Sequence, residues 1–162
     1  GRMQDARIDD LVHGIGSGLA AGVLQVMVGK AEEKLLLPPG EDADIAPRLV
    51  RRLAEGVGER VSPPTAWVLG TAFHFGYAAF WGAVYALARE RFRFSPVVGG
   101  AILGGLIYGI TFPSWGGAVQ TEVERPPEVR SRRMTFVALS VAAAFGMSTA
   151  MVYERFRNKV ET

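Results

Sequence analysis

The stretch "PVVGGAILGGLIYGITFPSW", residues 96–115, decides the fold class of this chain. It carries no charged side chain, whereas each helix of a soluble bundle needs a polar face toward water. As a helix it would extend about 30 Å, the thickness of the hydrocarbon core of a bilayer. The alternative is a soluble bundle of four fully buried helices, which the uncharged stretch disfavours. We therefore expect an integral membrane protein.

Three further apolar segments have a similar length, at about residues 11–28, 65–88 and 134–153. The first can continue as a helix to Leu37, because Pro38 follows and ends it. It has acids rather than a basic leader, and three more spans follow, so it does not resemble a cleaved signal peptide. The sequence predicts an all-α protein, a membrane four-helix bundle forming a single transmembrane domain over residues 1–162. Gly1 and Arg2, ahead of Met3, look like a cloning remnant.

The tetrapeptide "ERFR" follows two of these segments, at residues 90–93 and 154–157. At an offset of 64, nine of the 23 positions from Thr71 to Arg93 match their counterparts. The first and third segments match more faintly at an offset of 87. Chance similarity between Ala/Gly-rich helices is the alternative, but it explains ERFR poorly. We expect two tandem helical hairpins, about residues 10–93 and 97–157.

The two hairpins have the same orientation, because each crosses the membrane an even number of times. They are therefore parallel repeats, and both ERFR blocks share one face with the N-terminus. The positive-inside rule assigns that arginine-rich face to the cytoplasm. The loop 116–133 conflicts with this assignment, since it ends in "RSRR" but would lie outside. We expect a multi-pass protein with cytoplasmic N- and C-termini.

Glycines four residues apart predict where the helices approach closely. Small residues line helix contacts in lipid, because van der Waals packing rather than the hydrophobic effect drives association there. The first and third segments hold most of them, so we expect those two helices to form the central pair. The bulky second segment would then lie outside, against lipid or another subunit. The predicted packing glycines are Gly14, Gly18, Gly22, Gly100, Gly104, Gly105 and Gly109.

An amphipathic helix is predicted between the first two spans, over about residues 43–61. Apolar side chains such as Ile45, Leu49 and Leu53 recur there at helical spacing, with Arg and Glu on the other side. Such a helix can lie in the headgroup region or cap the end of the bundle.

Few polar side chains fall within the apolar spans. His74 and Gln25 lie inside them, and Glu32 and Glu33 lie near the end of the first. An ionisable group in a membrane is expensive, so these four form a candidate polar site. The alternative is a neutral His74 bonded to a neighbouring helix, with the acids paired to lysines at the interface.

Several classes of function are disfavoured by what the sequence lacks. It has no cysteine, no Zn-ligand spacing and no Ser/His/Asp set, and "GIGSG" lies inside an apolar span rather than in a phosphate loop. A bis-His haem is disfavoured because His13 and His74 belong at opposite depths. The net charge of +2 is too small to indicate nucleic acid. We expect no enzyme, metal or cofactor.

Three stretches resemble the YagU-like family of bacterial inner-membrane proteins: "GVLQVMVGKAEEKLLLPPGED", "AFHFGYAAFWGAVYALARERF" and "YGITFPSWGG". The matching features are an acid before a Leu-Pro-Pro exit, a His followed by Gly and Tyr, and a Phe-Pro pair. Gly40 departs from the basic residue expected there. The resemblance implies an inner-membrane location and no established activity. It singles out Glu33 or Glu32, Pro38, Pro39, His74 and Pro113.

Two functions remain open from the sequence. The first is a non-enzymatic structural or oligomer-forming protein, whose partners are membrane lipids and copies of itself. The second is a small unit for proton or solute permeation that uses Glu33 and His74, since a His can change charge near neutral pH. Permeation needs polar residues at several depths, and the spans offer few, so the first is preferred.

Overall fold

Serine and proline set where two of the long helices begin. Ser62 and Ser95 each precede a proline, and their hydroxyl oxygens accept hydrogen bonds from the third amide beyond, at 3.4 and 3.3 Å. Proline is tolerated directly after such a cap, because the first N–H groups of a helix lack partners. The helices α3 (Pro63–Arg91) and α4 (Pro96–Thr111) start in this way.

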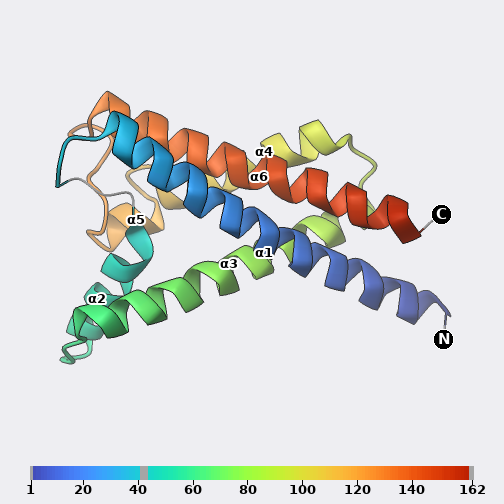
Figure 1. Ribbon diagram of the computed structural model, residues 1–162, viewed down its shortest axis with the longest axis horizontal. Helices are drawn as coiled ribbons and strands as arrows, with labels where there is room; N and C mark the ends of the chain where they lie inside the picture. Colours follow the sequence, from blue (N-terminus) through green and yellow to red (C-terminus); the bar gives the residue numbers. More distant parts are fainter. Residues whose placement is uncertain (1, 41–43, 161–162) are drawn as a thin grey trace.

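All secondary structure in the described residues is helical (Figure 1). The computed structural model describes residues 2–40 and 44–160, with side chains over residues 7–40 and 44–159. Besides α3 and α4, it contains α1 (Arg2–Leu36), α2 (Ile45–Gly56), α5 (Gly117–Gln120) and α6 (Arg132–Val160). The predicted helical segments are thus confirmed, with α1 continuing to the prolines as expected, except that α4 ends at Thr111 rather than at Trp115. The short α5 was not predicted.

The long helices pack in the order α3, α1, α6, α4. α1 contacts α3 along one side and α6 along another, and α4 packs against α6 (Figure 1). α1 does not pack along α4, so the expected central pair of first and third segments is wrong. The small residues of α1 meet small residues of α3 instead. The molecule is therefore a row of four helices, not a bundle with α1 and α4 at its centre.

The crossing of α1 and α3 brings two backbones into contact. A Cβ added at Gly14 would lie 2.6 Å from the carbonyl oxygen of Gly82, and one added at Gly18 would collide with the carbonyl of Ala78. A Cβ on Gly82 would in turn lie 2.8 Å from Cα of Gly18. Gly22 also faces α3, with Cβ of Ala78 at 3.0 Å from its own would-be Cβ. These glycines therefore pack as predicted, although against a different helix.

α4 and α6 cross in the same way, with glycines of one helix against the backbone of the other. A Cβ on Gly146 would collide with the carbonyl of Gly100 and lie 2.9 Å from Cα of Gly104. A Cβ on Gly104 would lie 2.9 Å from the carbonyl oxygen of Ala142. Gly100 and Gly104 thus occupy the places that Gly14 and Gly18 have in the first crossing.

Gly105 and Gly109 do not pack against another helix. Nothing lies within 4 Å of a Cβ built on either residue. The predicted packing role of these two is therefore wrong for contacts within the chain. Gly100 and Gly104 form the close contact instead, because one helical face cannot present both Gly104 and Gly105 to the same neighbour.

The four long helices converge near the end that carries both termini (Figure 1). There Tyr85 of α3 is buried, with ring centroids 5.9 Å from Phe94 and 5.6 Å from Tyr153 of α6. Arg89 of α3 and Glu154 of α6 form an ion pair at 2.6 Å. The core cluster around Tyr85 draws on α1, α3, α4 and α6. The other half of α3 diverges from α6, so the outer helices of the row come together only at this end.

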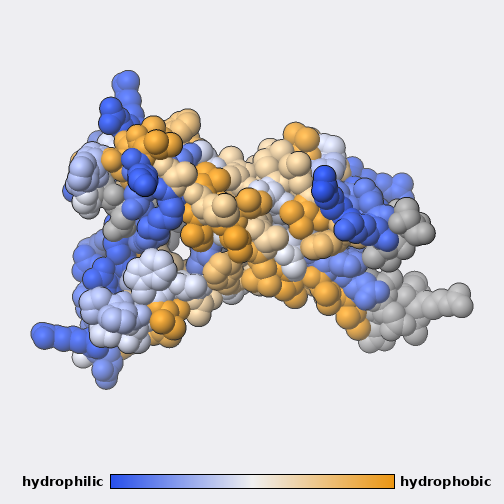
Figure 2. Space-filling view, viewed as in Figure 1, coloured by the Kyte–Doolittle hydropathy of each residue, from blue (hydrophilic) through white to orange (hydrophobic). Residues whose placement is uncertain are grey.

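Apolar side chains cover the middle of the molecule and polar ones cover its two ends (Figure 2). Two helical stretches, Arg7–Leu36 and Arg132–Lys159, are long and apolar enough to cross a membrane, and Pro96–Thr111 is a shorter apolar helix. Large exposed side chains on this belt include Val23, Met27, Phe73, Phe80, Ile102, Leu106, Phe136 and Met151.

The amphipathic helix between the first two long helices is confirmed as α2. It packs against the N-terminal half of α3, where a Cβ on Gly70 would lie 2.7 Å from the Pro47 nitrogen. Ile45 and Leu49 are half-buried, whereas Leu53 is exposed. None of its residues is fully buried. Together with α5, α2 occupies the end of the molecule opposite the termini (Figure 1).

Candidate functional site

His74 lies on the face of α3 that is turned toward α1. Its Nε2 is 3.1 Å from the carbonyl oxygen of Gly22. A carbonyl can only accept, so Nε2 carries the hydrogen and donates it. Gly22 lacks a side chain, and a Cβ there would meet Ala78 and Phe75 of α3. The contact is a hydrogen bond from the histidine to the backbone of a neighbouring helix.

Glu33 is held at the end of α1 by a lysine. Lys30 Nζ lies 3.2 Å from Glu33 Oε2 and also bonds to Asp44, which precedes α2. The side chains of Glu33 and Asp44 are only partly buried, with exposed fractions of 24% and 34%. The ion pairs therefore fasten the first residues of α2 to α1, as expected for acids paired at an interface.

Glu32 points to the other side of α1, toward α6. Its Oε1 lies 2.7 Å from the hydroxyl oxygen of Ser140 in α6. Its Oε2 is buried and has no hydrogen-bond partner among the described residues. Sequence analysis missed Ser140, although a serine inside an apolar run was a visible signal. This pair joins the two predicted hairpins, because α1 belongs to one and α6 to the other.

The four predicted site residues do not converge on one point in the described chain. Gln25 is half-buried and forms no hydrogen bond with a described residue. His74 contacts α1 at Gly22, and Glu32 lies ten residues further along that helix. Ten residues correspond to about 15 Å of helix. The structure thus places the polar groups in separate contacts between helices.

A buried arginine organises the loop before α6, although nothing in "RSRR" distinguishes it from its neighbours. The side chain of Arg130 is 1% exposed. Its Nη2 donates to the carbonyls of Phe112 and Arg125, each at 2.7 Å, and its Nε lies 3.9 Å from Glu124. The guanidinium also covers the Phe112 ring at 5.5 Å. Arg130 therefore anchors the loop to the end of α4.

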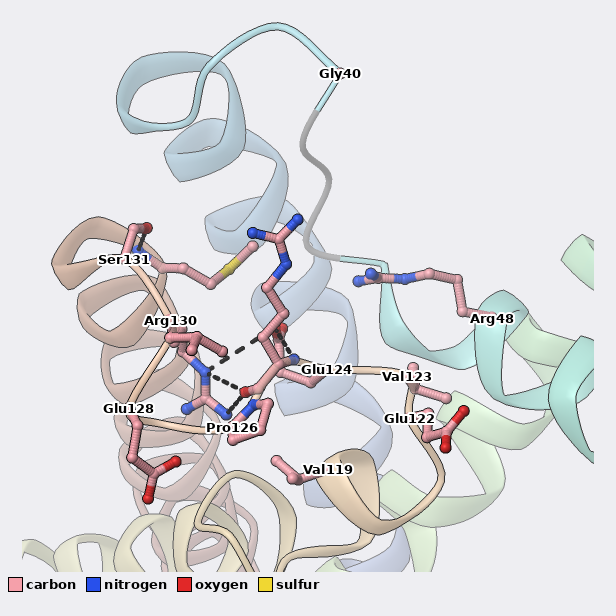
Figure 3. A pocket seen from close by; sticks show the side chains of 13 residues that line it. Gly40, Arg48, Val119, Glu122, Val123, Glu124, Pro126, Glu128, Arg130 and Ser131 are labelled. Carbon is pink, nitrogen blue, oxygen red and sulfur yellow. Dashed lines mark hydrogen bonds and ion pairs between the residues drawn. The ribbon is translucent and has the colours of Figure 1, made fainter.

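A pocket of about 700 Å³ opens beside this loop (Figure 3). Gly40 and Arg48 line one side of it, and residues 119–131 with Met134 line the other. Three arginines and three glutamates share the lining, and Arg130 is already engaged by Glu124. The pocket has no excess of either charge, and it holds no group of His, Asp and Glu placed to bind a metal in the described residues.

No family model, curated protein or solved structure matches this chain. The YagU-like resemblance therefore stays a prediction.

Proposed function

We propose that this chain is a small multi-pass protein of the bacterial inner membrane with a non-enzymatic, structural or oligomer-forming role. In this arrangement α1, α3, α4 and α6 cross the bilayer, and α2 and α5 lie at the outer end. Lipids cover the apolar belt (Figure 2). The observation that carries the proposal is the pair of glycine crossings, which bring the helix backbones into contact while many large apolar side chains stay exposed.

The duplication of a helical hairpin is part of this proposal. Gly82 packs on the carbonyl of Gly14 and on Gly18, and Gly146 packs in the same way on Gly100 and Gly104. These contacts support the offset of 64 between α3 and α6. They favour an offset of 86 rather than 87 between α1 and α4. A copied hairpin would preserve such a crossing, because a side chain at either glycine blocks the approach.

The side of the molecule where α3 and α4 do not pack along each other favours an oligomer. α3 and α4 meet only near Tyr85, and their outward faces carry exposed apolar residues such as Phe80 and Ile102. Lipid or a second copy can cover these faces. We propose the second copy as a partner in the membrane, with lipid filling the remaining surface.

Permeation through Glu33 and His74 is less well supported. Such a path needs polar groups that succeed one another through the membrane. His74 is engaged by the Gly22 carbonyl and Glu33 by Lys30. Tight backbone contacts at Gly14 and Gly100 occupy the half of the molecule nearer the termini.

Reconstitution in lipid vesicles separates the two functions. We expect native mass spectrometry from nanodiscs to show a defined oligomer, and proton flux into dye-loaded vesicles to equal that of empty vesicles. Variants His74→Ala and Glu33→Gln should leave that baseline unchanged. A flux above the baseline that either variant abolishes would establish permeation instead, and a monomer at all protein-to-lipid ratios would refute the oligomer.

A further inference from the structure

At the contact between Glu32 and Ser140, the serine hydroxyl lies close to more hydrogen-bond acceptors than it has hydrogens to donate. Ser140 Oγ lies 2.7 Å from Glu32 Oε1 and 2.8 Å from the carbonyl oxygen of Phe136. A hydroxyl has one hydrogen to donate, and an ionised carboxylate and a carbonyl can only accept. With an ionised Glu32, one of these short oxygen–oxygen contacts therefore has no hydrogen of its own.

A hydrogen on Glu32 resolves the conflict. The acid O–H then donates to Ser140 Oγ, while the serine hydroxyl donates to Phe136, one turn earlier in α6. Each short contact gains one hydrogen in this arrangement. Oε2 also fits better, because a neutral carbonyl oxygen that is buried without a partner costs far less than a buried charge.

The surroundings of Glu32 provide no counter-charge. It forms no ion pair with any described residue, and Lys30, on its own helix, is bound to Glu33 and Asp44. In α6 the nearest charged residues, Arg132 and Arg133, precede Ser140 by about two turns. α4 has no charged residue within its bounds. Glu32 lies four residues before the end of α1, and Ser140 lies eight residues after the start of α6.

We propose that Glu32 and Ser140 form a proton-binding site between α1 and α6. The ligand is a single proton, held on the carboxyl of Glu32 and shared with the hydroxyl of Ser140. Loss of the proton leaves a negative charge on the half-buried Glu32, whose Oε2 has no hydrogen-bond partner among the described residues, and so weakens the contact between α1 and α6 at this end. The site thereby makes the contact between the two hairpins depend on proton binding, which goes beyond the structural role proposed above.

Infrared spectroscopy of the protein in nanodiscs tests this site directly. A protonated carboxylic acid has a carbonyl stretch that an ionised carboxylate lacks. We expect this band in the wild type and its loss on alkaline titration, together with a fall in melting temperature. Glu32→Gln should lack the band and lose that part of the pH dependence. Glu33→Gln is the matched control, one residue away and ion-paired, and should keep both.

Ser140→Ala keeps the test decisive if Glu32→Gln fails to fold. It retains the acid but removes the acceptor, so the band should shift to the higher frequency of a weakly bonded acid. The proposal is overturned if the wild type and Glu32→Gln give the same spectrum in this region. It is equally overturned if Ser140→Ala leaves the band where it was, because the proton would then not be shared with the serine.

Discussion

At the scale of single residues, Arg130 stands out because its charged side chain is buried. An arginine cannot lose its charge in a protein, so burying it is favourable only if its donors are used. Phe112, Arg125 and Glu124 use two of its three nitrogens. The third, Nη1, has no partner among the described residues. The loop conformation before α6 therefore depends on this side chain more than on any other in the loop.

Replacing Arg130 by Met should lower the free energy of unfolding by about 3 kcal/mol, because it removes the donor to the carbonyls of Phe112 and Arg125 and leaves the carboxylate of Glu124 without its cation. The measurement is thermal or denaturant unfolding in detergent. Arg132→Met and Arg133→Met are matched controls, since both arginines are exposed, and they should stay within about 0.5 kcal/mol of the wild type. Equal effects of all three changes would show that Arg130 acts only through net charge.

At the scale of helices, the two glycine crossings set which helices become neighbours. Gly82→Ala and Gly146→Ala each insert a methyl against a facing backbone, and overpacking of this kind costs about 1–3 kcal/mol. We expect both variants to melt at lower temperature in detergent, by similar amounts, since their contacts are equivalent. Gly105→Ala is the control, because its Cβ would meet open space. A loss of stability in Gly105→Ala comparable with the other two would mean that α4 packs through its opposite face.

These crossings also show what could be read from the sequence and what could not. Prolines and apolar runs located the helices, and the glycine spacing located the faces of close approach. The spacing did not reveal which helix each face meets, because a stripe of small residues suits any neighbour equally well. The pairing of Glu32 with Ser140 was hidden for a related reason. The two residues are 108 positions apart, and only the packing of α1 on α6 brings them together.

At the scale of the whole molecule, burial of Arg130 bears on the orientation. The loop 116–133 opposed the predicted topology because its arginines would lie outside. One of these arginines is engaged by Glu124 within the fold, so the loop offers less free positive charge than its sequence indicates. The end with the termini keeps exposed cations, including Arg91, Arg93 and Arg155. The opposite end also keeps exposed cations, including Arg51, Arg52, Arg132 and Arg133, so cytoplasmic termini stay a prediction.

Cysteine labelling tests both the membrane insertion and this orientation, because the natural chain has no cysteine to compete. Glu128 and Asn158 are exposed; Glu128 precedes the long helix α6 and Asn158 lies in its last turn, so the helix separates them by about 40 Å. In intact bacterial cells, a membrane-impermeant maleimide should label Glu128→Cys, and it should label Asn158→Cys only after lysis. Labelling of Asn158→Cys alone would reverse the orientation. If neither variant is labelled until lysis, α6 does not cross the inner membrane, and the apolar belt would need a cover other than lipid.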